Sequence, residues 1–353
     1  MTRAKYVALV AFALFASCKE HDEPPPPVDA GPPQWRVVLD HLDGTLLSVW
    51  GSSERDVWTV GGPLGNTPYE SLVLRFDGTT WKRIEVGGTE TFWWVSGTSA
   101  NDVWLVGEKG RIAHFDGTTF RETPSGTTAT LFGVWASSAS NAWAVGGAPD
   151  GTGPKDVVLH WDGMSWKSET LPSASNVALF KVWGLDENDV YVVGDAGVVW
   201  HRTNGTWARE AVGLAKGRIT TVSGCGPNRI FAVGGRDILA SNGRSWTRVA
   251  DVLLVNDVNG VACAPTGALP HDFGDAVIVG GGSLKLRLVG GAFVNDFGTE
   301  PFTDLHGAWV DPGGSFWAVG GNFNGAPQPN VSRNGVIAHF GRSVVPSTVD
   351  GAP

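Results

Sequence analysis

Two cysteines stand at matching places in neighbouring repeats, and their chemistry is the most specific that this sequence offers. Cys225 ends the segment Val222-Ser223-Gly224-Cys225, and Cys263 ends Val261-Ala262-Cys263. Thiols at the ends of adjacent strands form a disulfide in an oxidising compartment. In the chain-entropy model, closing a loop of about 39 residues stabilises the fold by about 4 kcal/mol. The sequence predicts a Cys225–Cys263 disulfide, with two buried free thiols as the alternative.

Carboxylates are the other candidates for chemistry, because a pair of acids can hydrolyse a glycosidic bond. The loop carboxylates that could do so are Glu70, Glu108 and Asp150, and solvated surface acids are the simpler interpretation. No nucleophile–base pair and no metal-ligand spacing can be seen, since strand histidines such as His114 and His160 fall in different repeats. We therefore expect a protein that is not an enzyme, without catalytic residues, metal or cofactor.

A short strand that ends in Val-Gly recurs seven times, and this repeat determines where the candidate residues lie in the fold. The segments are Asp56–Gly61, Asp102–Gly107, Asn141–Gly146, Asp189–Gly194, Arg229–Gly234, Asp275–Gly280 and Ser315–Gly320. Their glycines lie about 40 to 48 residues apart, the period of a four-stranded propeller blade. The sequence predicts an all-β, seven-bladed β-propeller.

Each repeat is expected to hold four strands, such as residues 46–51, 57–61, 72–76 and 80–86 in the first. Side chains alternate along a strand, so Trp58 and Val60 face one neighbouring blade and the smaller residues beside them face the other. The bulky face of one blade should fill the space left by the next.

Two local features of the repeat carry further predictions. Asp77-Gly78 and its equivalents predict two-residue hairpin turns of type I′, which need positive φ at both positions. The acid that opens the second strand, such as Asp56, is expected to make a side-chain-to-backbone turn rather than to bind calcium.

The two ends of the chain are predicted to meet in one blade. Residues 34–40 resemble the outer strand of a repeat, but no first, second or third strand precedes them. Trp35 of this segment matches Trp81 of the first repeat. The last repeat has only a weak outer strand at Ser343–Pro346. We expect residues 34–40 to supply the outer strand of blade seven and to close the ring.

The start of the chain has the pattern of a secretory signal. Arg3 and Lys5 precede an apolar stretch of about ten residues, too short to cross a bilayer as a helix. Leu14-Phe15-Ala16-Ser17-Cys18 resembles the bacterial lipobox, which implies that Cys18 is acylated; an ordinary secretory signal is the alternative. Lys19 after the cysteine implies outer-membrane sorting.

These patterns divide the chain into three parts. We expect a signal peptide over residues 1–17, a proline-rich tether over 18–33 and the propeller over 34–353. The net charge of −9 and pI near 5.3 argue against nucleic acid as a partner. The expected partners are the membrane, through the lipid, and an envelope protein or polysaccharide.

Loop lengths point to one binding face. The loops between second and third strands are long at 62–71, 147–156 and 321–334 and lie on the same face as the connections between blades, because strands alternate in direction. The short loop of repeat two should therefore form the floor of a crevice. The candidate ligand-binding residues are Asn66, Tyr69, Glu70, Glu108, Lys109, Asp150, Lys155, Asn322 and Phe323. The alternative is that these loops are tolerated surface insertions.

The repeat resembles those of bacterial secreted propellers of the BNR-like and photosystem II assembly-factor-like groups. The resemblance covers residues 34–345 and is closest to lipoproteins with tandem Val-Trp-Gly, Asp-Val-Trp-x-Val-Gly and Phe-Asp-Gly-x-x-Trp units. The Asp-box Ser-x-Asp-x-Gly-x-x-Trp is absent as written. The resemblance is specific for the fold. Rim loops on rigid strands, with no visible nucleophile–base pair or metal-ligand spacing, favour a non-catalytic binding or assembly scaffold of the cell envelope. The alternatives are a carbohydrate-active enzyme and a component of an adhesion or pilus-type machine.

The lipobox resemblance gives a direct test. Cys18→Ser removes the thiol to which the lipid would be attached, so this variant should be released as a soluble and folded protein. Fractionation of cells that express each form measures the outcome. Membrane attachment of Cys18→Ser equal to that of the wild type would show that the segment is not a lipoprotein signal.

Overall fold

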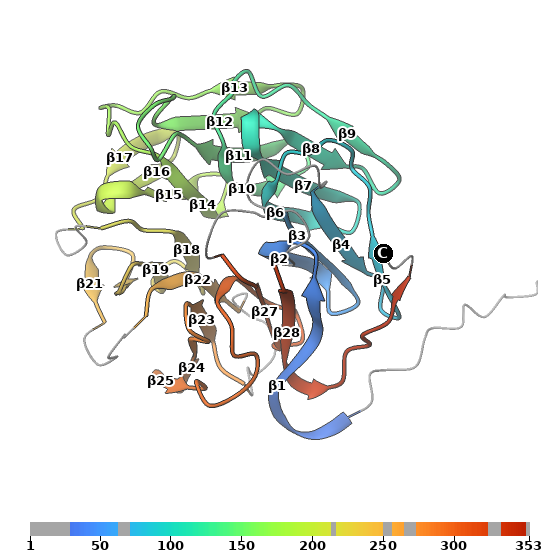
Figure 1. The fold of residues 1–353 in the computed structure, drawn as a ribbon. Helices are drawn as coiled ribbons and strands as arrows, with labels where there is room; N and C mark the ends of the chain where they lie inside the picture. The colour runs from blue at the N-terminus through green and yellow to red at the C-terminus, as the bar shows by residue number, and fades with distance from the viewer. Residues whose placement is uncertain are drawn as a thin grey trace, which may run out of the picture.

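The computed structural model describes residues 29–62, 71–212, 217–249, 256–264, 273–323 and 333–350, which form seven sheets arranged in a ring (Figure 1). Six sheets have four strands, and the sheet of blade one has five. In blades one to six the first strand of the repeat lies innermost and the last lies toward the perimeter (Figure 1). The all-β, seven-bladed propeller predicted from the repeats is confirmed.

The strands follow the predicted order in every blade. The innermost strands of blades one to seven are β2 (Thr45–Ser53), β6 (Phe92–Ser99), β10 (Leu131–Ser138), β14 (Leu179–Asp186), β18 (Thr221–Gly224), β22 (Val258–Cys263) and β26 (Leu305–Val310). The second strands are β3 (Asp56–Gly62), β7 (Asp102–Gly107), β11 (Asn141–Gly146), β15 (Asp189–Gly194), β19 (Ile230–Gly234), β23 (Ala276–Gly280) and β27 (Phe316–Gly320).

The third strands complete each apolar sheet, and the outer strands are mostly short. The third strands are β4 (Leu72–Phe76), β8 (Ile112–Phe115), β12 (Val157–Trp161), β16 (Val199–Thr203), β20 (Asp237–Ser241), β24 (Lys285–Val289) and β28 (Gly335–Ser343). The outer strands are β5 (Trp81–Arg83), β9 (Phe120–Glu122), β13 (Trp166–Ser168), β17 (Thr206–Arg209), β21 (Trp246–Arg248), β25 (Ala292–Asn295) and, in blade seven, β1 (Asp29–Leu42). Two short 3₁₀ turns are η1 (Glu108–Gly110) and η2 (Asp195–Gly197).

The ring is closed by both ends of the described chain. β1 pairs antiparallel with β28 and is the outer strand of blade seven, as predicted; it begins at Asp29, within the segment expected to be tether. The C-terminal strand β29 (Val349–Asp350) pairs parallel with β5 and adds a fifth strand to blade one. Figure 1 shows the red strand at the end of the described chain beside β5. The junction of blades seven and one is therefore spanned by the C-terminal segment.

The hairpins between third and outer strands differ from the predicted form in four blades. In blades one, two, three and five the turn has four residues, as in Asp77–Thr80, where Asp77 N–H donates to the Thr80 carbonyl at 3.1 Å. The Asp77 carboxylate accepts the N–H groups of Thr79 and Thr80 at 3.0 and 2.9 Å. These bonds stabilise the wider turn. The two-residue turn with positive φ at both positions occurs at Asn204-Gly205 and Gly290-Gly291.

One apolar cluster lies at each of the seven junctions between blades. Between blades one and two, Trp58 and Val60 pack against Val103 and Leu105, so the bulky face of one blade meets the smaller face of the next, as predicted. The indole of Trp58 has no exposed surface. Burying such a ring removes about 150–250 Å² of surface from water, so stability resides mainly between the blades.

In blades one, two and four, the acid that opens the second strand bonds to a side chain of the third strand, which corrects the expected backbone turn. In blade two, His114 Nε2 lies 2.6 Å from Asp102 Oδ1, and Thr98 Oγ1 donates to Asp102 Oδ2. In blade one, Arg75 Nε donates to Asp56 at 2.7 Å. The polar partner sits on the adjacent strand within the same blade, so the acid fastens two strands together.

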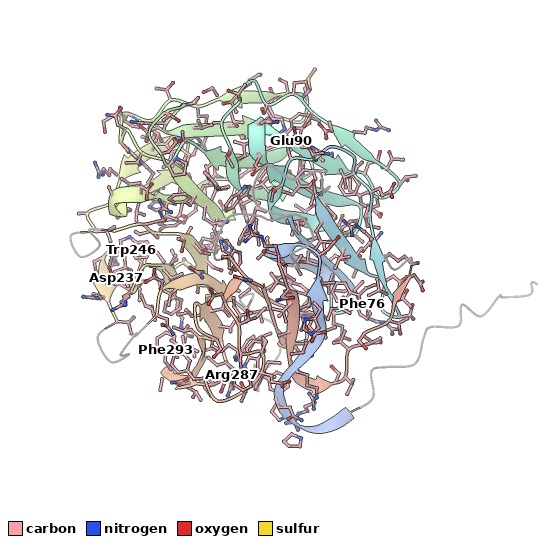
Figure 2. All side chains as sticks on the ribbon, in the orientation of Figure 1. Phe76, Glu90, Asp237, Trp246, Arg287 and Phe293 are labelled. Carbon is pink, nitrogen blue, oxygen red and sulfur yellow. A yellow bond between two sulfur atoms is a disulfide. The ribbon has the colours of Figure 1, made fainter. Side chains whose placement is uncertain are left out.

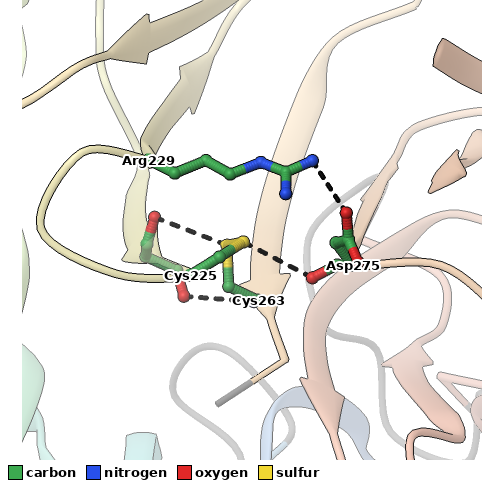
Figure 3. The surroundings of a disulfide bond; sticks show 5 residues. Cys225, Arg229, Cys263 and Asp275 are labelled. Carbon is green, nitrogen blue, oxygen red and sulfur yellow. Dashed lines mark hydrogen bonds and ion pairs between the residues drawn. A yellow bond between two sulfur atoms is a disulfide. The ribbon is translucent and has the colours of Figure 1, made fainter. Parts of the chain in front are cut away.

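The structure contains the predicted Cys225–Cys263 disulfide, with the two Cα atoms 4.9 Å apart (Figure 3). Cys225 follows β18, and Cys263 ends β22, so the bond joins blades five and six. Beside it, an Arg229–Asp275 ion pair at 2.8 Å connects the same two blades. The covalent and ionic contacts together hold this junction at the face opposite the connections between blades.

A buried lysine side chain also stabilises the fold, at the connection between blades six and seven. Lys285 of β24 has no exposed surface, and its ammonium donates to the carbonyls of Ser283, Thr299 and Pro301 at 3.1, 3.0 and 3.1 Å. Burial lowers the pKa of Lys285 to about 8. Three acceptors match the three N–H donors of the ammonium, so the charge holds the connection from blade six to blade seven in place.

Lys285→Met should destabilise the protein, because it leaves three buried carbonyls without a donor. Each unsatisfied group costs about 1–3 kcal/mol, so we expect a loss of at least about 3 kcal/mol in the free energy of unfolding. Denaturant titration measures it, with exposed Lys82→Met as the control. A change for Lys285→Met no larger than that for the control would contradict this role.

Candidate functional site

The loops between second and third strands and the connections between blades lie on one face, here called the connection face. In blade two, the N–H of Glu108 in η1 donates to the carbonyl of Thr91 in the preceding connection at 3.0 Å. In blade four, Asp195 N–H and the Ala178 carbonyl make the equivalent bond at 3.0 Å. Two hollows on this face contain residues that could hold a ligand.

The first hollow, the axial mouth, lies where the innermost strands begin. It has a volume of about 550 Å³, and its lining includes Leu47, Trp93, Asn259, His306 and Phe323. In six blades the innermost strand has a β-bulge near its start, which re-aims one side chain. The residue at each bulge, together with the residue at the equivalent position of blade five, belongs to a set that we call the axial ring. Its members are Leu47, Trp93, Phe132, Phe180, Thr220, Asn259 and His306.

One side of the axial ring is aromatic and the other is polar. The rings of Trp93 and Phe132 lie 4.9 Å apart and those of Phe132 and Phe180 5.2 Å apart. On the other side, Thr220 Oγ1 donates to the carbonyl of Asn259 at 2.9 Å. His306 Nδ1 lies 2.8 Å from the Leu47 carbonyl. That bond requires a proton on Nδ1, so in the neutral ring Nε2 is an acceptor.

Lys181 is a buried basic side chain close enough to the axial ring to lower the pKa of His306. Its side chain is 4 % exposed; Nζ lies 2.9 Å from the Phe132 carbonyl and 3.0 Å from the centre of the Trp94 ring. Burial lowers the pKa of Lys181 well below its ordinary value. Burial and then the charge of Lys181 lower the pKa of His306 to about 4. The histidine is therefore neutral at pH 7.

The second hollow, the blade-two cleft, has a volume of about 870 Å³ above η1. Its lining includes Glu90, Glu108, Lys109, Glu122 and Pro154, the last from the long loop of blade three. Figure 2 labels Glu90 at this site. Lys109 Nζ pairs with Glu90 at 3.0 Å, and Glu108 accepts an N–H from the connection at 3.1 Å. The cleft is thus polar, with more carboxylates than free cations.

Arg111 is part of the cleft wall but is already satisfied within the protein. Its Nε donates to Glu122 at 2.6 Å, its other nitrogens donate to carbonyls that include that of Val86, and the guanidinium lies 4.3 Å from the Phe92 ring centre. Its side chain is 7 % exposed. Arg111 therefore shapes the cleft, and Glu108 and Lys109 are the charged residues of η1 that line it.

The structure separates the residues that the sequence grouped into one crevice. Glu108 and Lys109 line the blade-two cleft, and Phe323 lies at the axial mouth, 5.5 Å from the His306 ring. Asp150 and Lys155 are exposed on the long loop, of which only Pro154 lines the cleft, and Asn322 is exposed beside Phe323. Cys18, Asn66, Tyr69 and Glu70 lie outside the described residues.

Sequence reasoning missed the axial ring and Lys181. The signal available was the residue after the first apolar position of each innermost strand, which is aromatic in Trp93, Phe132 and Phe180. Within the described residues, no group of three His, Cys, Asp or Glu side chains could hold a metal ion, and no helix is long and apolar enough to span a bilayer.

No family model and no curated protein matches this chain. Its fold is similar to that of YCF48 bound to a D1 peptide, with 14 % identity, TM-score 0.62 and coverage of 89 % of this chain and 98 % of the other. Streptogramin B lyase has 11 % identity, TM-score 0.64 and coverage of 87 % and 98 %. The propeller domain of Doa1 has 11 % identity, TM-score 0.65 and coverage of 87 % and 97 %. These similarities establish the fold alone.

Acid should weaken the fold through its buried histidines. Burial lowers the folded pKa of His306 to about 4 and that of His339 to about 3, against about 6.5 when unfolded. Below pH 6.5 the unfolded chain therefore binds more protons, and each histidine removes roughly 1.4 kcal/mol per pH unit until its folded pKa is reached. Burial raises the pKa of Asp311 to about 6, which offsets one proton of this difference between pH 6 and 4.

Denaturant titrations from pH 7 to 4 test this expectation. The free energy of unfolding should fall as the pH decreases, and the double variant His306→Gln, His339→Gln should show a much shallower fall. Parallel slopes for the two proteins would mean that these histidines are not held neutral in the fold.

Proposed function

We propose that this protein is a non-catalytic binding or assembly scaffold of the bacterial cell envelope, anchored by lipid at Cys18 in the outer membrane. A partner, in our proposal a segment of an envelope protein, binds to the connection face. The observation that carries this proposal is the blade-two cleft, a hollow of about 870 Å³ built on a short turn between longer loops. Rigid strands beneath variable loops suit recognition.

The chemistry of the cleft favours a polar partner. Its charged residues include Glu108 and Lys109, and its rim has serine and threonine residues beside Pro124 and Pro154. The fold neighbour YCF48 was solved with a bound peptide, which supports a polypeptide over a polysaccharide as the partner. Net charge of −9 also keeps nucleic acid outside the proposal.

A peptide array and a glycan array, probed with soluble Cys18→Ser protein, test the proposal. The double variant Glu108→Ala, Lys109→Ala should weaken binding at least tenfold without a change in melting temperature. Glu187→Ala, which lines a hollow near the opposite ends of the innermost strands, is the control and should bind normally. The reverse pattern would place the site on the wrong face, and no binding to either array would remove its support.

A glycosidase is the second candidate, because the pKa values of one pair of acids in the cleft are shifted in opposite directions. The Lys109 ammonium lowers the pKa of Glu90, whereas burial raises the pKa of Glu108. Such a split is typical of the acid and the nucleophile of glycosidases. We expect no turnover of chromogenic glycosides, because Glu90 is already paired. Turnover that Glu108→Gln abolishes would favour the enzyme instead.

A further inference from the structure

The proposed function does not use the axial mouth. This hollow of about 550 Å³ is lined by residues of blades one, two, five, six and seven and of the connections between them, and it shares no lining residue with the blade-two cleft. Aromatic rings form one part of its lining, and hydrogen-bonding side chains form the other. A ligand in the mouth would therefore bind independently of the cleft.

Three aromatic rings line the mouth, those of Trp93, His306 and Phe323, and each side chain is partly exposed. The ring centres of Trp93 and His306 lie 6.5 Å apart with the planes at 65°, and those of His306 and Phe323 lie 5.5 Å apart with the planes at 38°. The rings do not stack on one another, so apolar ring surface remains for a ligand. Thr45 Oγ1 donates to the carbonyl of Asn322 at 3.2 Å, which fixes the backbone next to Phe323.

Three side chains of the mouth offer hydrogen-bond acceptors. Asp304 Oδ1 accepts the Gly282 N–H at 2.7 Å, which holds the carboxylate in place, and Oδ2 makes no hydrogen bond within the described residues. His306 Nδ1 donates to the Leu47 carbonyl at 2.8 Å. Burial lowers the pKa of His306 to about 4, so the ring is neutral at pH 7 and its Nε2 is an acceptor. The exposed carboxylate of Asp257 is the third acceptor group.

Two side chains of the mouth offer hydrogen-bond donors. Arg236 Nε lies 3.9 Å from Asp257 Oδ1, which is longer than a hydrogen bond, and the two side chains are 66 % and 70 % exposed. The guanidinium therefore keeps its N–H groups for a ligand. The amide of Asn256 lies beside Gly282, whose φ is +59°; a Cβ at that position would come within 2.4 Å of Asn256 Nδ2. Glycine at this position leaves the amide room at the mouth.

This combination of groups narrows the class of ligand. A carboxylate or a phosphate would meet the charges of Asp257 and Asp304, and a cation would meet that of Arg236. A hydroxyl group both donates and accepts, so a neutral ligand with several hydroxyls can bond to donors and acceptors of the mouth at once. The C–H groups on the face of a sugar ring are apolar and would pack against the aromatic rings.

We propose that the axial mouth binds a neutral saccharide. One sugar ring packs against Phe323 and His306, and its hydroxyls bond to Asp304 and Arg236. The inference goes beyond the proposed function: it adds a ligand of another class at a second site on the same face, and it does not depend on a partner in the cleft.

The glycan array probed with soluble Cys18→Ser protein tests this inference, and the neutral glycan that binds best is then titrated by calorimetry. Phe323→Ala should weaken its binding at least about tenfold by removing ring surface, and Asp304→Asn should do the same by removing a charged acceptor. Asparagine can still accept the Gly282 N–H, so the connection should keep its structure. Phe302→Ala is the matched control and should bind normally, because Phe302 is 68 % exposed on the connection that carries Asp304 but does not line the mouth.

Arg236→Ala gives a variant without a structural cost, because the side chain is 66 % exposed. It should weaken glycan binding severalfold at an unchanged melting temperature. Failure of every neutral glycan to bind, wild-type affinity in Phe323→Ala and Arg236→Ala, or a preference for glycans that contain uronic acid would overturn the inference. The cleft variant Glu108→Ala, Lys109→Ala should bind the glycan normally and lose only the peptide, so each proposal can fail without the other.

Discussion

Each blade of this protein has two apolar faces, and both must be covered by neighbours. An apolar cluster occupies all seven junctions, and the tryptophans of the second strands have no exposed surface in blades one, two, three and seven. A row of such blades with open ends would leave two apolar faces in water. Closure of the ring is therefore the condition on which the remaining structure depends.

The arrangement of side chains on the connection face follows from the closed ring. Seven innermost strands begin there side by side, and in six of them a bulge turns one side chain toward a common axis. The axial mouth and the polar blade-two cleft both occur on this face.

The sequence predicts the fold well because period and alternation are local properties. The Val-Gly strands specify the blade, and the match of Trp35 to Trp81 predicts the strand that closes the ring. It could not predict the two-residue strand β29, which has no pattern of its own. The partner of Asp56 was also missed, since Arg75 lies on another strand and only pairing register brings the two together.

The candidate site was predictable only in part, for the same reason. Loop lengths identify a face, but the position of each residue on it depends on contacts between blades: Glu108 and Phe323 belong to different hollows. Lys181 has no sequence signal, because its burial follows from contacts with other blades, namely the Phe132 carbonyl and the Trp94 ring.

Thermal unfolding of a protein that lacks residues 29–42 tests the central claim most directly. β1 is the outer strand of blade seven and its removal exposes the apolar surface of β28. If closure holds the ring together, the melting temperature should fall by more than about 10 °C and the whole protein should lose structure in that transition. A melting temperature within about 2 °C of the full-length value would contradict the account.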